Sequence, residues 1–148
     1  MKISIASDHG GYDLKEKIAE HLKSLGHEVI NQGPFDKSSV DYPLFARKTA
    51  DDVAENRADF GIVCCTSAEG VAITANKVKG IRCGIGYTDE VSAKMREHND
   101  CNMIAFGQGY MAEEDVIRRV DIFLNTPFEG GRHKRRVDEI MEIEKLGR

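Results

Sequence analysis

Short apolar runs alternate with longer segments of mixed polarity along the whole chain. Runs rich in Ile, Val, Phe and Cys are typical of buried strands, whereas apolar residues spaced three and four apart predict amphipathic helices. The pattern predicts strands at residues 2–6, 27–31, 59–64, 81–86 and 102–106. It predicts helices at residues 12–25, 43–54, 71–77, 89–97, 113–124 and 132–146.

Strand and helix therefore follow one another in five successive units. Neighbouring parallel strands need a crossover connection, and a sheet built this way is covered by helices on both faces. We expect one domain over residues 1–148, an α/β three-layer αβα sandwich with a five-stranded parallel sheet and a C-terminal helix. By analogy with flavodoxin-like folds, the expected strand order is 2-1-3-4-5.

Two loops rich in small and polar residues follow the first and third expected strands. Residues 7–11 read S-D-H-G-G, and residues 65–70 read C-T-S-A-E-G. Strands 1 and 3 flank the expected switch point of the sheet, where ligands bind outside the carboxyl ends of the strands. The side chains expected to line one crevice there are Asp8, His9, Cys65 and Ser67.

Cys65 stands at the junction between the third strand and its loop. If the strand alternates faces to its end, Cys64 points into the core when Cys65 points toward the loop. Loop N–H groups, together with the positive end of the next helix, favour an anion at this place. A thiol there ionises readily and can act as a base or nucleophile, whereas a thiol in apolar packing is inert. Residue chemistry alone leaves both interpretations of Cys65 open.

The charge balance restricts the partners. The chain has 148 residues, with 21 Lys and Arg against 25 Asp and Glu and a net charge of -4. That balance argues against nucleic acid or an anionic membrane as a general partner. No apolar run approaches the roughly 18 residues needed to span a membrane, and the first residues lack the pattern of a signal peptide. We therefore expect a cytoplasmic protein.

The four cysteines, at positions 64, 65, 83 and 101, form no C-x-x-C pair and have no histidines at zinc spacing. We interpret them as reduced thiols and expect no metal. A thiol redox protein that uses Cys64 and Cys65 is a minor alternative, because adjacent cysteines form only a strained ring.

A basic segment, R-H-K-R-R, opens the last expected helix at residue 132. Arg132 and Arg136 are one helical turn apart and project together, and two guanidinium groups on one face suit a phosphate. His98 follows the fourth expected helix in the sequence E-H-N-D, where a histidine commonly interacts with the helix dipole. Taken alone, these residues indicate a capping His98 and a phosphate-binding arginine pair.

Seven short motifs occur together in this chain. They are S-D-H-G-G-Y near the start, D-Y-P at residues 41–43, the C-T-S-A-E-G loop, A-N-K, G-I-R, H-N-D and G-G-R-H-x-x-R-V. In combination they closely resemble the type B ribose-5-phosphate isomerases, over essentially the whole chain, and also the related galactose-6-phosphate and allose-6-phosphate isomerases. The resemblance implies a five-stranded parallel sandwich that works without metal or cofactor, in homodimers whose active sites cross the subunit interface.

The resemblance also implies roles in interconverting ribose 5-phosphate and ribulose 5-phosphate. Cys65 would be the base that moves a proton between carbons 2 and 1 through an enediolate, whose oxygens Ser67 and the loop amides would hold. His98 would donate a proton during ring opening, helped by Asp8. Arg132 and Arg136 would clamp the phosphate, from the partner subunit. The expected substrate contacts are Asp8, His9, Tyr42, Thr66, Ser67, Ala68, Glu69, Gly70, Asn99, Arg132 and Arg136.

Some positions depart from the family pattern, which usually reads C-G-T-G-x-G in the loop. Thr66 and Ala68 replace two glycines, and a positive φ costs a β-branched Thr most. Either the loop has a different shape, or its glycines were not all needed for a positive φ. Glu69 adds negative charge near the expected anion, unless it pairs with Arg132 or acts as a second base. Gly109 stands where many members have a phosphate-contacting Arg.

These departures leave the preferred sugar undecided. Ribose 5-phosphate is the leading substrate, and another sugar phosphate, of the allose 6-phosphate or galactose 6-phosphate type, is the alternative within the same class. A different class of protein would be a non-catalytic sugar-phosphate-binding module that keeps the crevice but not the turnover. The choice between a homodimer and a tetramer also stays open.

Overall fold

The computed structural model describes residues 1–147. Its strands are β1 (Lys2–Ser7), β2 (Glu28–Asn31), β3 (Phe60–Cys65), β4 (Cys83–Ile85) and β5 (Met103–Gly107). Its helices are the short 3-10 helix η1 (His9–Gly11), α1 (Tyr12–Ser24), α2 (Tyr42–Ala54), α3 (Glu69–Asn76), α4 (Asp89–Glu97), α5 (Glu113–Asn125) and α6 (Arg132–Leu146). The expected strands and helices are confirmed, with bounds that differ by a residue or two. No helix within residues 1–147 has both the length and the apolar character that a membrane crossing requires.

The sheet is parallel throughout, with the strand order β2-β1-β3-β5-β4. The expected order 2-1-3-4-5 is therefore wrong on one side of the sheet, because β5 lies between β3 and β4. β5 is fully buried, which suits a central strand covered on both faces, whereas the three residues of β4 are only half-buried and form the edge. β1 and β3 are neighbours, so the expected switch point is retained.

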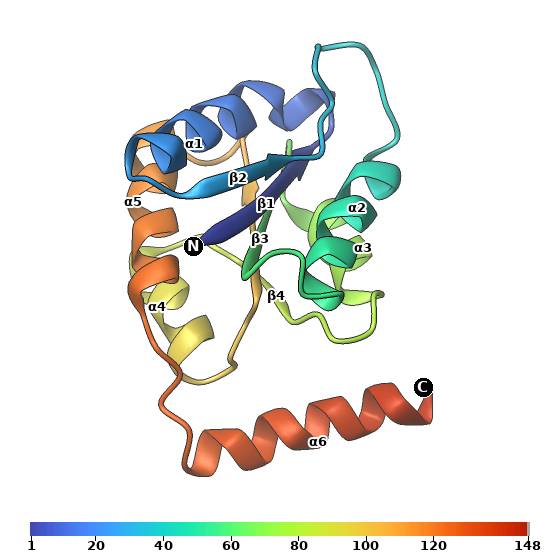
Figure 1. Cartoon of the computed structure of the whole chain (residues 1–148), viewed down its shortest axis with the longest axis vertical. Helices are drawn as coiled ribbons and strands as arrows, with labels where there is room; N and C mark the ends of the chain where they lie inside the picture. Colours follow the sequence, from blue (N-terminus) through green and yellow to red (C-terminus); the bar gives the residue numbers. More distant parts are fainter. Residues whose placement is uncertain (148) are drawn as a thin grey trace.

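Helices cover both faces of the sheet, as Figure 1 shows. Helices α1, α4 and α5 lie on one face, and α2 and α3 lie on the other. Side chains along β3 alternate between the two cores: Ile62 and Cys64 face the first group of helices, and Val63 and Cys65 face the second. The α/β sandwich expected from the sequence is confirmed.

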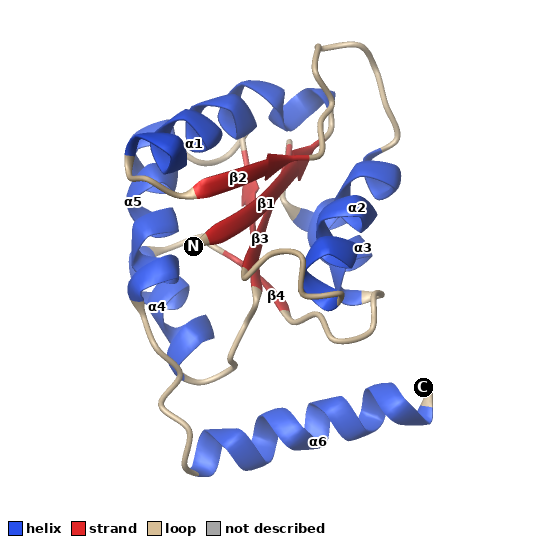
Figure 2. Ribbon diagram, in the orientation of Figure 1, coloured by secondary structure: helices blue, strands red, loops and turns tan. Residues whose placement is uncertain are grey.

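Helix α6 lies apart from both layers, at one end of the molecule (Figure 2). It touches the segment before β4, where Met141 Sδ accepts from Arg82 Nη1 at 3.2 Å and the Glu144 carboxylate accepts from the Gly80 N–H at 3.1 Å. Val137 is its buried residue. The apolar side chains further along α6 are exposed, with 47% for Ile140, 56% for Ile143 and 65% for Leu146. This helix thus carries an apolar stripe that the described part of its own chain leaves exposed to solvent.

A buried polar network fastens α2 to β1. Asp52 accepts from Ser4 Oγ and Gln32 Nε2, each at 2.7 Å, and from Arg57 Nε at 2.9 Å. Burial alone would raise the pKa of Asp52, but these three donors outweigh it and hold the pKa below its ordinary value. The carboxylate therefore stays charged and stabilises the contact between helix and sheet.

Candidate active site

The loops after β1 and β3 lie against each other at the carboxyl edge of the sheet. A Cβ atom at Gly11 would stand 2.5 Å from the Cys64 carbonyl carbon, and one at Gly10 would stand 2.2 Å from Thr66 Oγ1. Only glycine permits so close an approach. The Asp8 N–H also donates to the Cys64 carbonyl at 3.2 Å. The two loops expected to share one site are therefore neighbours.

The adjacent cysteines at the end of β3 occupy opposite faces of the sheet. Cys64 is fully buried, and burial, followed by the neighbouring Cys65 thiol, raises the pKa of Cys64. Cys65 lies on the other face, is 5% exposed, and its Sγ accepts the Ala68 N–H at 3.2 Å. Cys65 is therefore enclosed by apolar packing and also faces a loop amide. An N–H group that donates to sulfur stabilises a thiolate.

Ala68 bends the loop that carries this amide. Its backbone is left-handed, with φ 75° and ψ -19°, and the residue is completely buried. Thr66 has no positive φ, so only one of the two substituted glycine positions needs the left-handed conformation. That conformation costs a non-glycine residue roughly 1–2 kcal/mol. The loop keeps a glycine-type turn without the glycine, and α3 begins directly after it, at Glu69.

Asp8 and His9 approach the site from the loop after β1. Asp8 is nearly buried, and its Oδ1 accepts the Gly11 N–H at 3.0 Å. His9 is exposed, and its Nδ1 accepts the Val40 N–H at 3.2 Å. The long connection between β2 and α2 therefore helps to orient the imidazole of His9.

Tyr42, Ser67 and Gly70 lie around the start of α3. A Cβ atom at Gly70 would stand 2.6 Å from the Tyr42 ring, so the ring packs directly on the helix backbone. Ser67 is exposed, and its Oγ accepts the Glu69 N–H at 3.3 Å. The carboxyl edge thus holds a thiol, a carboxylate, an imidazole, a phenol and a hydroxyl around one helix start.

A cavity of about 420 Å³ adjoins this loop on the side of β4 and β5, with Ser67 and Glu69 in its wall beside Tyr110. The nearby Gly109 donates its N–H to the Thr66 carbonyl at 2.9 Å, and a Cβ atom at Gly109 would stand 2.9 Å from Thr66 Cγ2. The two departures from the family pattern at positions 66 and 109 are therefore in contact, because the Thr66 methyl group fills space that a side chain at position 109 would need.

Four of the expected site residues lie at the amino edge of the sheet instead. His98 follows α4, and its N–H donates to the Lys94 carbonyl at 2.8 Å. The Asn99 carbonyl accepts from Nε of Arg82, which directly precedes β4, at 3.1 Å. The other two, Arg132 and Arg136, are exposed at the start of α6.

The full length of β5 separates these residues from Cys65. Cys65 pairs with Gly107 at the carboxyl end of β5, whereas the residue before β5, Asn102, donates its N–H to the Arg82 carbonyl at 3.0 Å. At about 3.3 Å per residue, the strand spans at least ~13 Å. Within one chain, the structure does not bring the amino-edge residues to the thiol. Nor does any ion pair join Glu69 to Arg132 within residues 1–147.

Two residues that the sequence analysis did not place in a site lie against His98. Glu129 Oε1 is 3.6 Å from His98 Nε2, and the His133 ring stacks on the His98 ring with centroids 4.1 Å apart and an angle of 11° between planes. Partial burial, His98 and the Arg132 guanidinium lower the pKa of His133, against the opposing effect of Glu129. The sequence signal for this contact was the run E-G-G-R-H, in which Glu129 and His133 stand on either side of a glycine turn.

This cluster has the composition of a metal site, with ligand atoms of His98, Glu129 and His133 all within 4.8 Å of one another. A metal ion lies about 2.0–2.1 Å from each imidazole nitrogen and in the plane of each ring. Two nearly parallel rings 4.1 Å apart cannot both direct a lone pair at one such ion. The geometry is that of a stacked imidazole pair beside a carboxylate.

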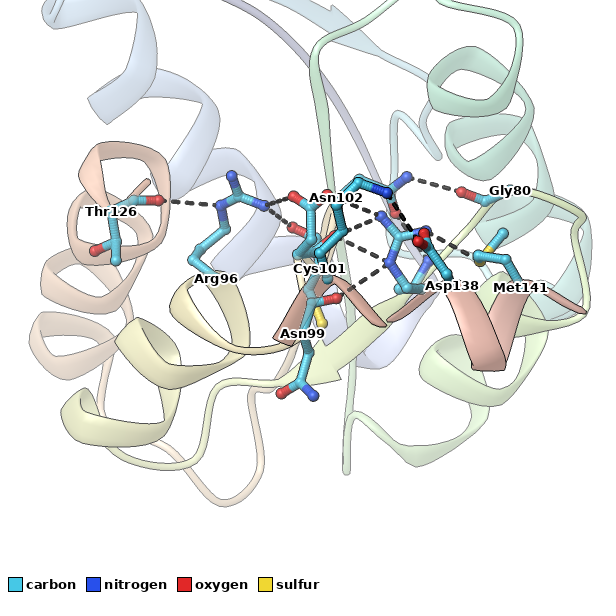
Figure 3. A network of polar contacts seen from close by, with 11 residues as sticks. Gly80, Arg96, Asn99, Cys101, Asn102, Thr126, Asp138 and Met141 are labelled. Atoms are coloured by element: carbon cyan, nitrogen blue, oxygen red, sulfur yellow. Dashed lines mark hydrogen bonds and ion pairs between the residues drawn. The ribbon is translucent and has the colours of Figure 1, made fainter. Parts of the chain in front are cut away.

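Buried polar contacts hold the amino-edge segments together, as Figure 3 shows. Arg96 donates from Nε to the Thr126 carbonyl at 3.2 Å and from Nη1 to the Cys101 carbonyl at 2.7 Å. Asn102 Nδ2 donates to the Gly80 carbonyl at 2.9 Å. The end of α4, the start of β5 and the connection to α6 are therefore fixed relative to one another.

Comparison with known proteins gives full-length matches. The family model described as ribose/galactose isomerase matches residues 3–140. Ribose-5-phosphate isomerase B of Escherichia coli is 40% identical over 97% of both chains. The structure of Clostridium thermocellum ribose-5-phosphate isomerase B matches with a TM-score of 0.98 at 45% identity, covering 100% of both chains. The Mycoplasma genitalium enzyme, solved with bound ribulose-5-phosphate, matches with a TM-score of 0.93 at 40% identity, covering 97% of this chain and 96% of that one.

Proposed function

This chain belongs to the ribose/galactose isomerase family, and we propose that it interconverts ribose 5-phosphate and ribulose 5-phosphate as a cofactor-independent aldose–ketose isomerase. Full-length relatives of that name and a relative's structure with bound ribulose-5-phosphate support this substrate pair. The single observation that carries the proposal is the Cys65 sulfur at a strand end, accepting the Ala68 N–H at 3.2 Å.

The central step is the transfer of a proton from carbon 2 to carbon 1 of the open-chain sugar. The Cys65 thiolate takes the proton from carbon 2, and the electrons of that bond form the enediolate. N–H groups at the start of α3 and the Ser67 hydroxyl stabilise its oxygens. The thiol then returns the proton to carbon 1, while the proton on oxygen 2 moves to oxygen 1. The ketose forms with no net gain or loss of electrons.

Ribose 5-phosphate is a closed furanose in solution, so the ring must open first. The bond between carbon 1 and the ring oxygen breaks, His98 gives its proton to the ring oxygen, and Asp8 accepts the proton of the carbon 1 hydroxyl. Gly11 occupies only Oδ1 of Asp8, which leaves Oδ2 for the sugar. His9, Tyr42 and Asn99 hold the substrate hydroxyls, and loop residues 66–70 enclose carbons 1 and 2.

A second copy of the chain completes the site. His98 and the arginines of α6 lie at least ~13 Å from the Cys65 thiol of the same chain by the length of β5, too far to act on one pentose. In a two-fold dimer, the amino edge of one subunit meets the carboxyl edge of the other, and Arg132 and Arg136 bind the phosphate across the interface.

Exposed apolar surface supports this assembly. The stripe on α6 is left exposed by residues 1–147, and a groove between α2 and α3, lined by Leu44 and Val78 among others, is a cavity of about 530 Å³. Burial of α6 in such a groove of the partner would satisfy both surfaces. The proposal includes one isomerase domain over residues 1–148 and a cytoplasmic location, since the four cysteines are free thiols that suit a reducing compartment.

The test compares the two neighbouring cysteines. Purified protein without added metal is given ribose 5-phosphate, and ribulose 5-phosphate formation is measured for the wild type, Cys65→Ala and the matched control Cys64→Ala. We expect Cys65→Ala to lose about 10²–10⁴-fold in kcat, the size of a general-base contribution. Cys64→Ala should keep turnover, since its side chain lies on the opposite face of the sheet.

Full activity in Cys65→Ala would contradict the assignment and move the base elsewhere, with Glu69 tested next through Glu69→Gln. A wild type without turnover on ribose 5-phosphate would contradict the substrate. Six-carbon sugar phosphates and unphosphorylated sugars would then be tested, followed by ligand-induced thermal stabilisation, which would identify a binding module.

A further inference from the structure

Glu129 and His133 lie against His98 but have no role of their own in the proposed isomerase mechanism. We propose that Glu129 and His133 are positioning residues for His98, which fix the plane and the protonated nitrogen of its imidazole for ring opening. This inference rests on the proposed function, because it concerns how one residue of that reaction is held.

Backbone hydrogen bonds place Glu129 beside the imidazole. The Glu129 N–H donates to the Glu97 carbonyl at 3.0 Å, so the connection to α6 is fastened to the last residue of α4, directly before His98. The carboxylate is then held with Oε1 3.6 Å from His98 Nε2. A carboxylate at this nitrogen keeps a proton on Nε2, so that the doubly protonated imidazole gives its other proton, on Nδ1, to the ring oxygen and is left as the neutral Nε2–H form.

A glycine turn brings His133 to the same imidazole. Gly130 and Gly131 have φ values of 70° and 55°, with no atom within 4 Å of where a Cβ would stand. Their role is therefore conformational, since positive φ strains other residues. The turn reverses the chain between Glu129 and His133, and the His133 N–H donates to the Gly130 carbonyl at 3.1 Å. The ring of His133 then lies flat on that of His98 and restricts its rotation.

The charges around the cluster give Glu129 a second effect. Arg132 and Arg136 both act on His133 as positive neighbours, and a positive field opposes protonation of an imidazole. On α4 itself, Lys94 and Glu97 pair with each other at 3.2 Å. Glu129 opposes the effect of the two guanidinium groups on His133, and so partly neutralises the positive charge beside the stacked pair.

The chemistry of the two sugars separates ring opening from proton transfer. Ribulose 5-phosphate cannot form a furanose, because its carbon 5 oxygen carries the phosphate. Deuterium exchange from heavy water into its carbon 1 position therefore needs the base but no ring opening. Conversion of ribose 5-phosphate needs both steps. NMR measures the rate of deuterium exchange, which depends on Cys65 but not on ring opening. Ribulose 5-phosphate formation measures the rate of conversion, which also depends on His98.

We expect Glu129→Gln to lower kcat for ribose 5-phosphate by roughly 10- to 100-fold, less than the roughly 10²–10⁴-fold of a complete general-acid contribution, because His98 itself is retained. Its deuterium exchange should stay within about twofold of the wild type. The matched control is Glu139→Gln, because Glu139 is an exposed carboxylate on α6 whose ion pair within residues 1–147 is with Arg135, at 3.9 Å. It should change neither rate.

Two substitutions of His133 test the stacked ring in the same assays. His133→Ala removes the ring and should slow ribose 5-phosphate conversion, whereas His133→Phe keeps a flat ring and should restore most of that rate. Equal losses in both assays for Glu129→Gln would overturn the positioning role and indicate a structural one. An unchanged conversion rate for this variant would also overturn the positioning role. A wild type inactive in both assays would instead overturn the proposed function, and the inference with it.

Discussion

The two edges of the sheet are built by different physical means. At the carboxyl edge, backbone geometry dominates: a left-handed Ala68 directs an amide to a nearly buried thiol, and glycines allow two loops to touch. At the amino edge, charged and aromatic side chains dominate, with two exposed arginines beside a stacked imidazole pair. The first arrangement suits a small reactive group, and the second suits a charged one.

In the proposed mechanism, neither edge is sufficient alone. The carboxyl edge supplies the base and the enediolate-binding amides, whereas the Arg119 guanidinium in the wall of its cavity is already paired with Asp89 at 3.0 Å. The amino edge offers guanidinium groups and an imidazole, and burial raises the pKa of its two thiols, Cys83 and Cys101. In the proposed dimer, proton transfer and phosphate binding are divided between the two subunits.

The largest expected effect comes from mixing two inactive variants. Cys65→Ala lacks the carboxyl-edge base, and the double variant Arg132→Ala, Arg136→Ala lacks the amino-edge clamp. In a two-fold dimer, a mixed pair regains one intact site, so random subunit exchange should restore about a quarter of wild-type activity from nearly none. Activity that stays at the sum of the two parents would show that each site is built within one chain.

A smaller effect is expected from the phosphate clamp alone. Arg136→Ala should raise KM for ribose 5-phosphate by roughly 10- to 100-fold, since a charge-assisted contact contributes about 1.5–3 kcal/mol. Unphosphorylated ribose should show no such loss. Arg135→Ala is the matched control, because Arg135 is exposed and its ion pair in the described part of the chain is with Glu139 on α6. Equal effects of Arg136→Ala on both sugars would remove the phosphate assignment.

Backbone strain at the carboxyl edge can be tested through Ala68. Ala68→Val should destabilise the protein by about 2 kcal/mol or more in urea unfolding. A β-branched residue is strained at a positive φ, and its larger side chain does not fit into a filled core. Ala68→Gly should change stability by less than about 1 kcal/mol, since relief of the left-handed strain offsets the lost methyl burial. Equal unfolding free energies for the valine and glycine variants would contradict the left-handed turn.

The smallest effect is expected away from both edges, at Asp52. Its folded pKa lies below the ordinary value, so its stabilisation is present above the ordinary pKa of about 3.9 and is lost as the pH falls through the lower folded value. Asp52→Asn should reduce thermal stability at neutral pH and flatten its decline in acid. Melting temperatures from roughly pH 7 to pH 3 measure this, and parallel curves for both proteins would contradict it.

Periodicity predicted the elements and the contact between the loops after β1 and β3, because both follow from local pattern and parallel topology. The places of β4 and β5 were not predictable from the strand sequence order. They depend on which strand can be covered on both faces, and the fully apolar β5 satisfies that condition better than the short β4. The order of these two strands thus depends on long-range packing, which the flavodoxin-like strand order does not take into account.

The separation of the site residues between the two edges of the sheet could have been predicted from the sequence. A residue that follows a parallel strand lies at the carboxyl edge, whereas one that follows a covering helix lies at the amino edge. Cys65 and His98 therefore lie at opposite edges of the sheet. The contact between Thr66 and Gly109, and the stacking of His98 on His133, depend on three-dimensional proximity between distant segments. No spacing rule in a single sequence reports such contacts.

In the proposed dimer, helix α6 makes the working unit of this protein subject to mass action. Its arginines then serve the partner chain, while its contacts with its own chain within residues 1–147 include hydrogen bonds with Gly80 and Arg82. The rate per subunit should therefore fall on dilution below the dissociation constant of the dimer and recover on concentration. A substrate that bridges the two chains would strengthen the dimer in turn, so that the sugar phosphate helps to assemble the site that converts it.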